Sequence, residues 1–118
     1  MNSKYPLEER TTKFSEDIIV FVKKVKPSII ITPLLSQIIR SGTSIGANYM
    51  EANNASSKKD FQNKIFICKK EAQETKYWLH LIGKTEPIHE KDAQSLTEEV
   101  SQLIMIFQKI ITTLKNDK

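Results

Sequence analysis

The chain has few of the residues that interrupt helices or cross-link small folds. Its 118 residues include only three Gly, four Pro and one Cys. So few turn-forming residues argue against an all-β fold, which needs many tight turns. The single thiol, Cys68, excludes an internal disulfide and a cysteine-based zinc site, and it fits a reducing compartment. These scarcities favour an all-α protein of the cytoplasm.

Long apolar runs are also missing. The longest, such as residues 18–22, are far shorter than the roughly 20 residues that cross a bilayer. No N-terminal stretch joins a basic start to an apolar run in the manner of a signal peptide. We therefore expect a cytoplasmic location and no membrane partner. The length suits one hydrophobic core, so we expect a single domain over residues 1–118.

Hydrophobic spacing and helix-ending residues predict four helices. They cover about residues 7–26, 33–53, 58–82 and 89–115. Thr32 before Pro33 is interpreted as the N-cap of the second helix. Ser57 followed by Asp60 resembles a capping box for the third, and Gly83 is interpreted as its left-handed C-terminal cap.

The third and fourth predicted helices each carry an apolar seam with heptad spacing. The seams are Phe61, Ile65, Cys68, Ala72, Thr75, Leu79 and Ile82, and Ala93, Leu96, Val100, Leu103, Phe107, Ile110 and Leu114. Seams of this length predict long helices that pack at a shallow angle. Short connections make consecutive helices antiparallel. The predicted fold class is therefore all-α, an antiparallel up-and-down four-helix bundle.

The first and fourth helices are apolar around more of their circumference than one bundle can bury. Four aliphatic side chains lie outside the core stripes: Ile19, Val20, Ile104 and Ile106. A helix that is apolar all round is buried all round, so these four residues are predicted at a subunit interface. The alternative is that they are scattered exposed aliphatics, which soluble surfaces commonly carry.

The net charge of +4 is unevenly distributed. Residues 1–59 hold nine Lys or Arg against five Asp or Glu, whereas residues 60–118 hold nine of each. The basic excess lies in two clusters, which are candidate nucleic-acid contacts: Lys23, Lys24 and Lys26, and Lys58 and Lys59. Lysines near a helix C-terminus also suit the helix dipole, which explains the first cluster without a partner but not the second.

A polar stripe follows the second predicted helix and meets polar residues of the third. We predict a network of seven residues: Arg40, Ser44, Asn48, Glu51, Lys70, Glu71 and Glu74. Arg40 is expected to pair with Glu71 or Glu74, and Lys64 or Lys70 with Glu51. Such a stripe is either a solvated face or an internal network that fixes helix register.

The sequence contains partial matches to catalytic and metal-binding motifs, but without the surrounding elements that those motifs require. Residues 42–46 match G-x-S-x-G, but this motif needs a strand-to-helix turn, and here it falls within a helix. Gly42 and Gly46 are interpreted as permitting a close helix contact. A di-iron bundle needs Glu-x-x-His motifs, whereas Glu71 is followed by Glu74. We expect no catalytic residues, no metal and no cofactor.

Two segments carry a family resemblance. Residues 37–48 (QIIRSGTSIGAN), followed by Glu51 and Ala52, resemble the signature of the small bacterial four-helix-bundle proteins, the 23S ribosomal RNA intervening-sequence proteins. The third-helix run from Lys58 to Leu79 is similar to the matching segment of that family. The family is related to the accessory variability proteins of diversity-generating retroelements, which engage a reverse transcriptase and nucleic acid.

The resemblance implies a non-enzymatic homopentamer that associates with RNA or a ribonucleoprotein. The alternative is a protein-interaction scaffold, for example a reverse-transcriptase accessory protein, without direct nucleic-acid binding. A third hypothesis is an enzyme or small-ligand binder that uses Arg40, Asn48, Glu51 and Glu74, and it requires a closed cavity lined by those groups.

Overall fold

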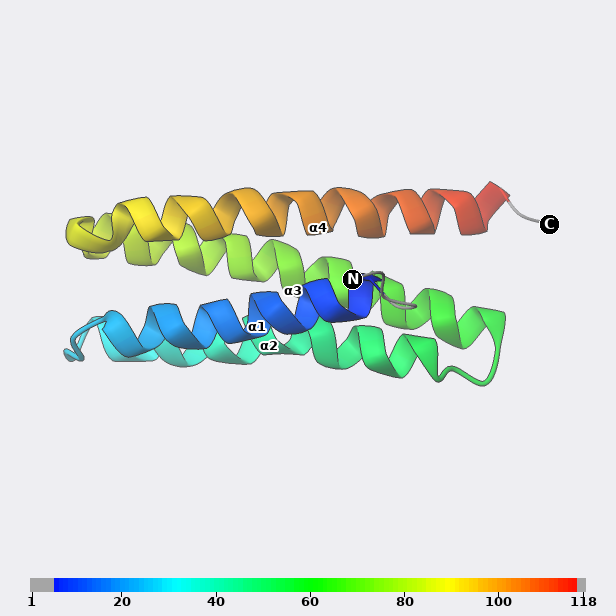
Figure 1. Ribbon diagram of the computed structural model, residues 1–118, viewed down its shortest axis with the longest axis horizontal. Helices are drawn as coiled ribbons and strands as arrows, with labels where there is room; N and C mark the ends of the chain where they lie inside the picture. The colour runs from blue at the N-terminus through cyan, green and yellow to red at the C-terminus, as the bar shows by residue number, and fades with distance from the viewer. Residues whose placement is uncertain (1–5, 117–118) are drawn as a thin grey trace.

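Four long helices make up the protein, for which a computed structural model describes residues 6–116. They are α1 (Pro6–Lys24), α2 (Ile31–Asn53), α3 (Lys58–Thr85) and α4 (Glu90–Asn116), with a short 3-10 helix, η1 (Pro87–His89), before α4. Consecutive helices run antiparallel in an elongated molecule of 49 × 29 × 21 Å (Figure 1). Residues 6–116 contain no β-strand. The predicted all-α, up-and-down four-helix bundle is confirmed.

The core follows the seams predicted on α3 and α4. Cys68, Leu79 and Phe107 are among the side chains that are almost completely buried. Near its C-terminal end, α4 buries Ile111 and leaves Ile110 only half-buried, although the heptad spacing placed Ile110 in the seam. An α-helix has 3.6 residues per turn, so its buried stripe drifts away from a strict seven-residue repeat.

Two predicted helix ends are wrong. Helix α2 begins at Ile31, so its N-cap position is Ile30 and not Thr32. The Ile31 backbone N–H donates to Ser28 Oγ at 3.1 Å, which satisfies one N–H of the first turn. Gly83 has no positive φ, and α3 continues past it to Thr85. The start of α3 is as predicted, because Ser57 Oγ accepts a hydrogen bond from the Asp60 backbone N–H at 3.0 Å.

The two glycines of α2 lie where α1 packs against it. A Cβ atom on Gly42 would lie 3.0 Å from Ile18 Cγ1, and one on Gly46 would lie 3.4 Å from the backbone of Thr11. This close approach supports the packing interpretation of residues 42–46. The pentapeptide lies inside α2, and Ser44 Oγ donates to the Arg40 carbonyl oxygen at 2.6 Å rather than facing a catalytic partner.

Helices α1 and α4 are neighbours, but α1 covers only part of α4. In Figure 1 the described part of α1 begins short of the right-hand end of the molecule, and the C-terminal part of α4 extends well beyond that point. The flank of α4 near its C-terminus is therefore not covered by α1. No helix within residues 6–116 is long and apolar enough to cross a membrane.

Candidate functional site

The two lysine clusters lie at opposite ends of the bundle. Lys23 and Lys24 end α1 and Lys26 follows in the connection to α2, whereas Lys58 and Lys59 begin α3 at the far end (Figure 1). All five lysines are exposed. Lys24 Nζ lies 3.7 Å from Asp92 Oδ2, so the first cluster is partly neutralised by the start of α4. A single chain therefore cannot present both clusters as one patch.

Arg40 is the centre of a charged group between α2 and α3. Its Nη1 donates to Glu71 Oε1 at 3.1 Å, and its Nη2 donates to Glu74. Glu74 also accepts from Trp78 Nε1 at 3.3 Å. The hydrogen bond from Arg40 lowers the pKa of Glu74, and the same bond raises the pKa of Arg40. This group joins two helices across one edge of the bundle.

Within residues 6–116, none of the other predicted network residues forms a hydrogen bond or an ion pair with the side chains of this group. Ser44 and Asn48 both bond to backbone carbonyls of their own helix, and the Asn48 amide donates to the Ser44 carbonyl oxygen at 2.8 Å. Glu51 pairs with Lys64 at 2.7 Å, one of the pairs expected from the sequence. Lys70 is exposed on α3, and its charge also lowers the pKa of Glu74. The stripe is thus divided into separate contacts along the α2–α3 edge.

These contacts weigh against the ligand-binding hypothesis. Arg40 and Glu74 neutralise each other, as do Lys64 and Glu51. Buried polar side chains within residues 6–116 all have hydrogen-bond partners, so no orphaned group is directed at a ligand. No group of three or more His, Cys, Asp or Glu side chains in this part of the chain is arranged to hold a metal ion.

The four aliphatic residues predicted at an interface lie on different flanks. Ile19 and Val20 are 44% and 52% exposed, and Val20 faces the groove between α1 and α4. Ile104 packs against the core, whereas Ile106 lies half-buried on the uncovered flank of α4. The structure adds neighbours to Ile106 that the sequence pattern assigned to the core seam: Ile110 and Leu114.

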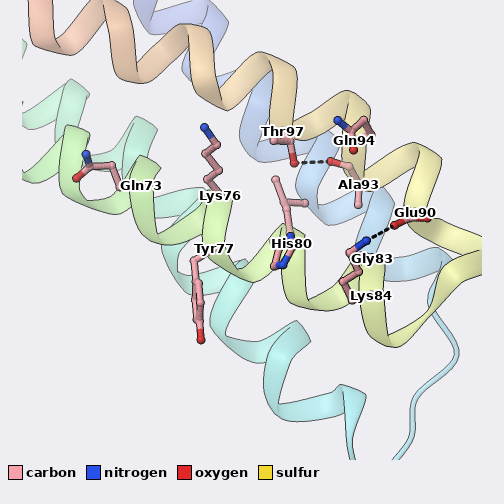
Figure 2. A pocket seen from close by; sticks show the side chains of 11 residues that line it. Gln73, Lys76, Tyr77, His80, Gly83, Lys84, Glu90, Ala93, Gln94 and Thr97 are labelled. Carbon is pink, nitrogen blue, oxygen red and sulfur yellow. Dashed lines mark hydrogen bonds and ion pairs between the residues drawn. The ribbon is translucent and has the colours of Figure 1, made fainter.

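A surface depression lies between α3 and α4 near η1. It has a volume of about 520 Å³ and is lined by polar side chains of both helices (Figure 2). Lys76 extends from α3 toward α4, and Lys84 pairs with Glu90 at 3.3 Å. Tyr77 projects from α3 on the side away from Lys76 and is 56% exposed. Sequence reasoning did not identify this groove, because its residues are scattered polar positions beside the seams.

Two polar contacts were also missed. Arg10 on α1 forms a bidentate ion pair with Glu99 on α4, at 2.8 Å for both hydrogen bonds. Thr75 Oγ1 donates to Ser41 Oγ at 2.9 Å inside the core between α3 and α2. The one available signal was Thr75 itself, a polar residue in an otherwise apolar seam.

The antiparallel arrangement, the apolar seams and the charged helix edges define an all-α, up-and-down four-helix-bundle protein. The model of the 23S rRNA-intervening sequence protein family matches residues 5–109, and the chain belongs to this family. No curated protein matches it.

A solved structure has the same fold. It is the crystal structure, at 1.70 Å resolution, of a protein with unknown function from the S23 ribosomal protein family of Bacteroides thetaiotaomicron VPI-5482. It superposes with a TM-score of 0.79 and 36% sequence identity, over 88% of this chain and 96% of that chain.

Proposed function

We propose that the protein is a non-enzymatic, homo-oligomeric binding module of the cytoplasm that associates with RNA or a ribonucleoprotein. The observation that carries this proposal is the pair of exposed lysine clusters at the two ends of a bundle belonging to the 23S rRNA-intervening sequence protein family. Clustered lysines attract the phosphates of nucleic acid without selecting a base sequence.

Self-association would increase this charge. One chain carries a net charge of only +4, which is modest for a nucleic-acid binder. A homopentamer, as the resemblance implies, would carry about five times that charge and would repeat each lysine cluster around a ring. Each end of the bundle would then form one basic rim.

The uncovered flank of α4 supports an assembly of this kind. Ile106, Ile110 and Leu114 line an apolar depression of about 320 Å³ on this flank. Met105 beside it is 69% exposed. Aliphatic side chains grouped in this way are typical of protein contacts. Replacing Ile106 with Glu should lower the oligomer mass measured by sedimentation, while Thr12→Glu on the exposed face of α1 should not.

RNA binding is tested with a salt series on a structured RNA. The wild-type protein should bind at low salt and lose affinity steeply as salt rises, because bound lysines release condensed counterions. A variant with Lys23, Lys24 and Lys26 replaced by Gln, and another with Lys58 and Lys59 replaced by Gln, should each bind more weakly with a shallower salt slope. Absence of binding by the wild type at low salt would refute this function.

The second candidate is a protein-interaction scaffold without direct RNA binding. It is favoured by the same apolar flank of α4, which would then receive a partner protein instead of another copy of the chain. Purification from native cells would recover a stoichiometric protein and no RNA, and Ile106→Glu would release that protein.

A further inference from the structure

The acidic residues of α3 all lie on one flank, together with Lys64 and Lys70, whereas the opposite flank carries only lysines among its charged residues. At about 100° per residue, its three acidic residues fall on the side that faces α2 or solvent: Asp60, Glu71 and Glu74. On the flank toward α4, lysines recur at Lys58, Lys69, Lys76 and Lys84, which are separated by 11, 7 and 8 residues. These spacings are close to whole numbers of helical turns, so the four lysines lie along one side of the helix.

Helix α4 contributes almost no negative charge to the same groove. Glu99 faces α1, where it binds Arg10, and Asp92 lies near Lys24. The α3-facing side of α4 instead presents neutral polar residues, including Thr97 and Gln108. Glu90 lines the groove at one end and pairs with Lys84. Glu98, next to Thr97, is exposed and does not line the depression. The groove therefore keeps a net positive charge along its length.

Two of the groove lysines are available to a polyanion. Lys76 is exposed and forms no ion pair with another described residue (Figure 2). Lys69 Nζ donates to Gln108 Oε1 at 2.6 Å, a neutral partner that leaves the positive charge uncompensated. From Lys69 to Lys84 the rise of the helix gives a basic track of about 22 Å. At one end this track leads toward Lys58 and Lys59.

An exposed aromatic ring follows Lys76 in α3 and projects away from α4, outside the groove itself (Figure 2). Tyr77 is 56% exposed, and its ring makes an edge contact with Trp78 at 5.2 Å between centroids. That contact supports the ring from one side without covering all of it. Proteins that bind single-stranded nucleic acid combine a positively charged groove that follows the backbone with aromatic side chains on which bases stack.

We propose that the α3–α4 groove binds single-stranded RNA, with Lys69 and Lys76 contacting phosphates in the groove and Tyr77, on the other side of α3 from Lys76, stacking on a base turned out of the groove. This inference rests on the proposed RNA-binding function and assigns it to a site that the lysine clusters alone did not indicate. Phosphate contact at the groove is independent of base sequence, and the ring of Tyr77 favours unpaired bases over a duplex.

The test measures fluorescence anisotropy of a labelled single-stranded RNA of mixed sequence, about 12 nucleotides long, over a series of salt concentrations. A variant with Lys69→Gln and Lys76→Gln should bind more weakly, and its salt slope should be shallower by about 1.4, since each lost phosphate contact removes about 0.7. A variant with Lys13→Gln and Lys91→Gln loses the same charge outside the groove and should keep the wild-type slope.

Tyr77 supplies a second, charge-neutral readout. Tyr77→Ala should weaken binding of the single strand about fivefold or more, whereas Tyr77→Phe should bind as the wild type does. A duplex of the same length should bind less tightly and should not respond to Tyr77→Ala. Because Tyr77 is exposed, circular dichroism should show that these variants keep the wild-type fold.

Failure of the inference can be told apart from failure of the proposed function. If the wild-type protein binds neither the single strand nor the duplex at low salt, the groove assignment and the RNA-binding function are both refuted. If it binds but the groove variants match the control, while replacing Lys23, Lys24 and Lys26 abolishes binding, the RNA-binding function stands and the groove assignment is wrong. Equal binding of duplex and single strand, with no effect of Tyr77→Ala, would likewise overturn the single-strand assignment.

Discussion

Arg10 of α1 and Glu99 of α4 are joined by two hydrogen bonds, Nε to Oε2 and Nη2 to Oε1, each 2.8 Å long. Arg10 also donates to Gln102 at 2.7 Å. A bidentate guanidinium–carboxylate pair has better geometry than most surface ion pairs. Here it links the first helix to the last, where α1 covers only part of its neighbour.

A double-mutant cycle should therefore detect coupling between these two residues. For Arg10→Ala and Glu99→Ala we expect a coupling free energy of about 0.5–1 kcal/mol in urea unfolding, because both side chains are about one-third exposed and solvent weakens the pair. The exposed pair Lys13–Asp17 serves as the control and should give a smaller value. Coupling no larger than that of the control would contradict a structural role for Arg10 and Glu99.

Replacing Gly42 of α2 and Gly83 of α3 with Ala should change the stability of the protein in opposite directions. Gly→Ala in a helix interior normally stabilises by about 0.5–1 kcal/mol, and Gly83→Ala should do so because its new Cβ would lie 3.5 Å from Ala93 Cβ. Gly42→Ala should instead lower the melting temperature, since its Cβ would lie 3.0 Å from the fully buried Ile18. Calorimetry that gave both variants the same sign would refute this account of the α1–α2 contact.

Glu74 should make stability depend on pH in the acid range. The hydrogen bond from Arg40 holds the pKa of Glu74 below its usual value in the folded protein. Its contribution is therefore present above the unfolded pKa of about 4.3 and is lost as pH falls through the lower, folded pKa. Between pH 5 and pH 3, stability should fall less for Glu74→Gln than for the wild type.

Glu16→Gln is the matched control for this series. Glu16 is exposed on α1 and forms no ion pair within residues 6–116. Chemical denaturation of this variant should follow the pH dependence of the wild type. If the stability of Glu74→Gln depends on pH in the same way as that of the wild type and of Glu16→Gln, Arg40 does not stabilise the ionised Glu74 carboxylate.

Cys68 should be unreactive in the native protein. Burial raises the pKa of its thiol to about 12, and its Sγ donates to the Ile45 carbonyl oxygen at 3.5 Å. Thiol reagents attack the thiolate, so at pH 8 labelling by a disulfide reagent should require unfolding. The labelling rate should rise with denaturant as the unfolded fraction rises. Immediate labelling without denaturant would contradict the burial of this side chain.

The sequence predicted the fold because the bundle depends on repeated local patterns. Apolar residues at helical spacing and the Ser57 cap are features of neighbouring residues, and both were found where expected. The errors at Thr32 and Gly83 concern residues with more than one compatible backbone role. Glycine permits a left-handed cap but also remains helical, and here it continues α3 beside Ala93.

The candidate sites were harder to predict because they depend on which helix faces are adjacent. The ion pairs of Arg40 with Glu71 and Glu74 could be predicted because α2 and α3 are consecutive helices whose polar stripes lie next to each other. The Arg10–Glu99 pair joins residues 89 positions apart, so no local sequence pattern predicts it. The α3–α4 groove has the same origin, since Lys69 and Lys76 line a groove only when α4 is in place.

Native mass spectrometry of the full-length protein with a structured RNA at low ionic strength tests the central claim most directly. We expect a homo-oligomer, a pentamer as the family resemblance implies, and a further series of peaks shifted by the mass of the bound RNA. Ile106→Glu should reduce the protein mass toward that of one chain. A wild-type spectrum that contains only single chains without RNA would contradict the proposal that this protein is an oligomeric RNA-binding module.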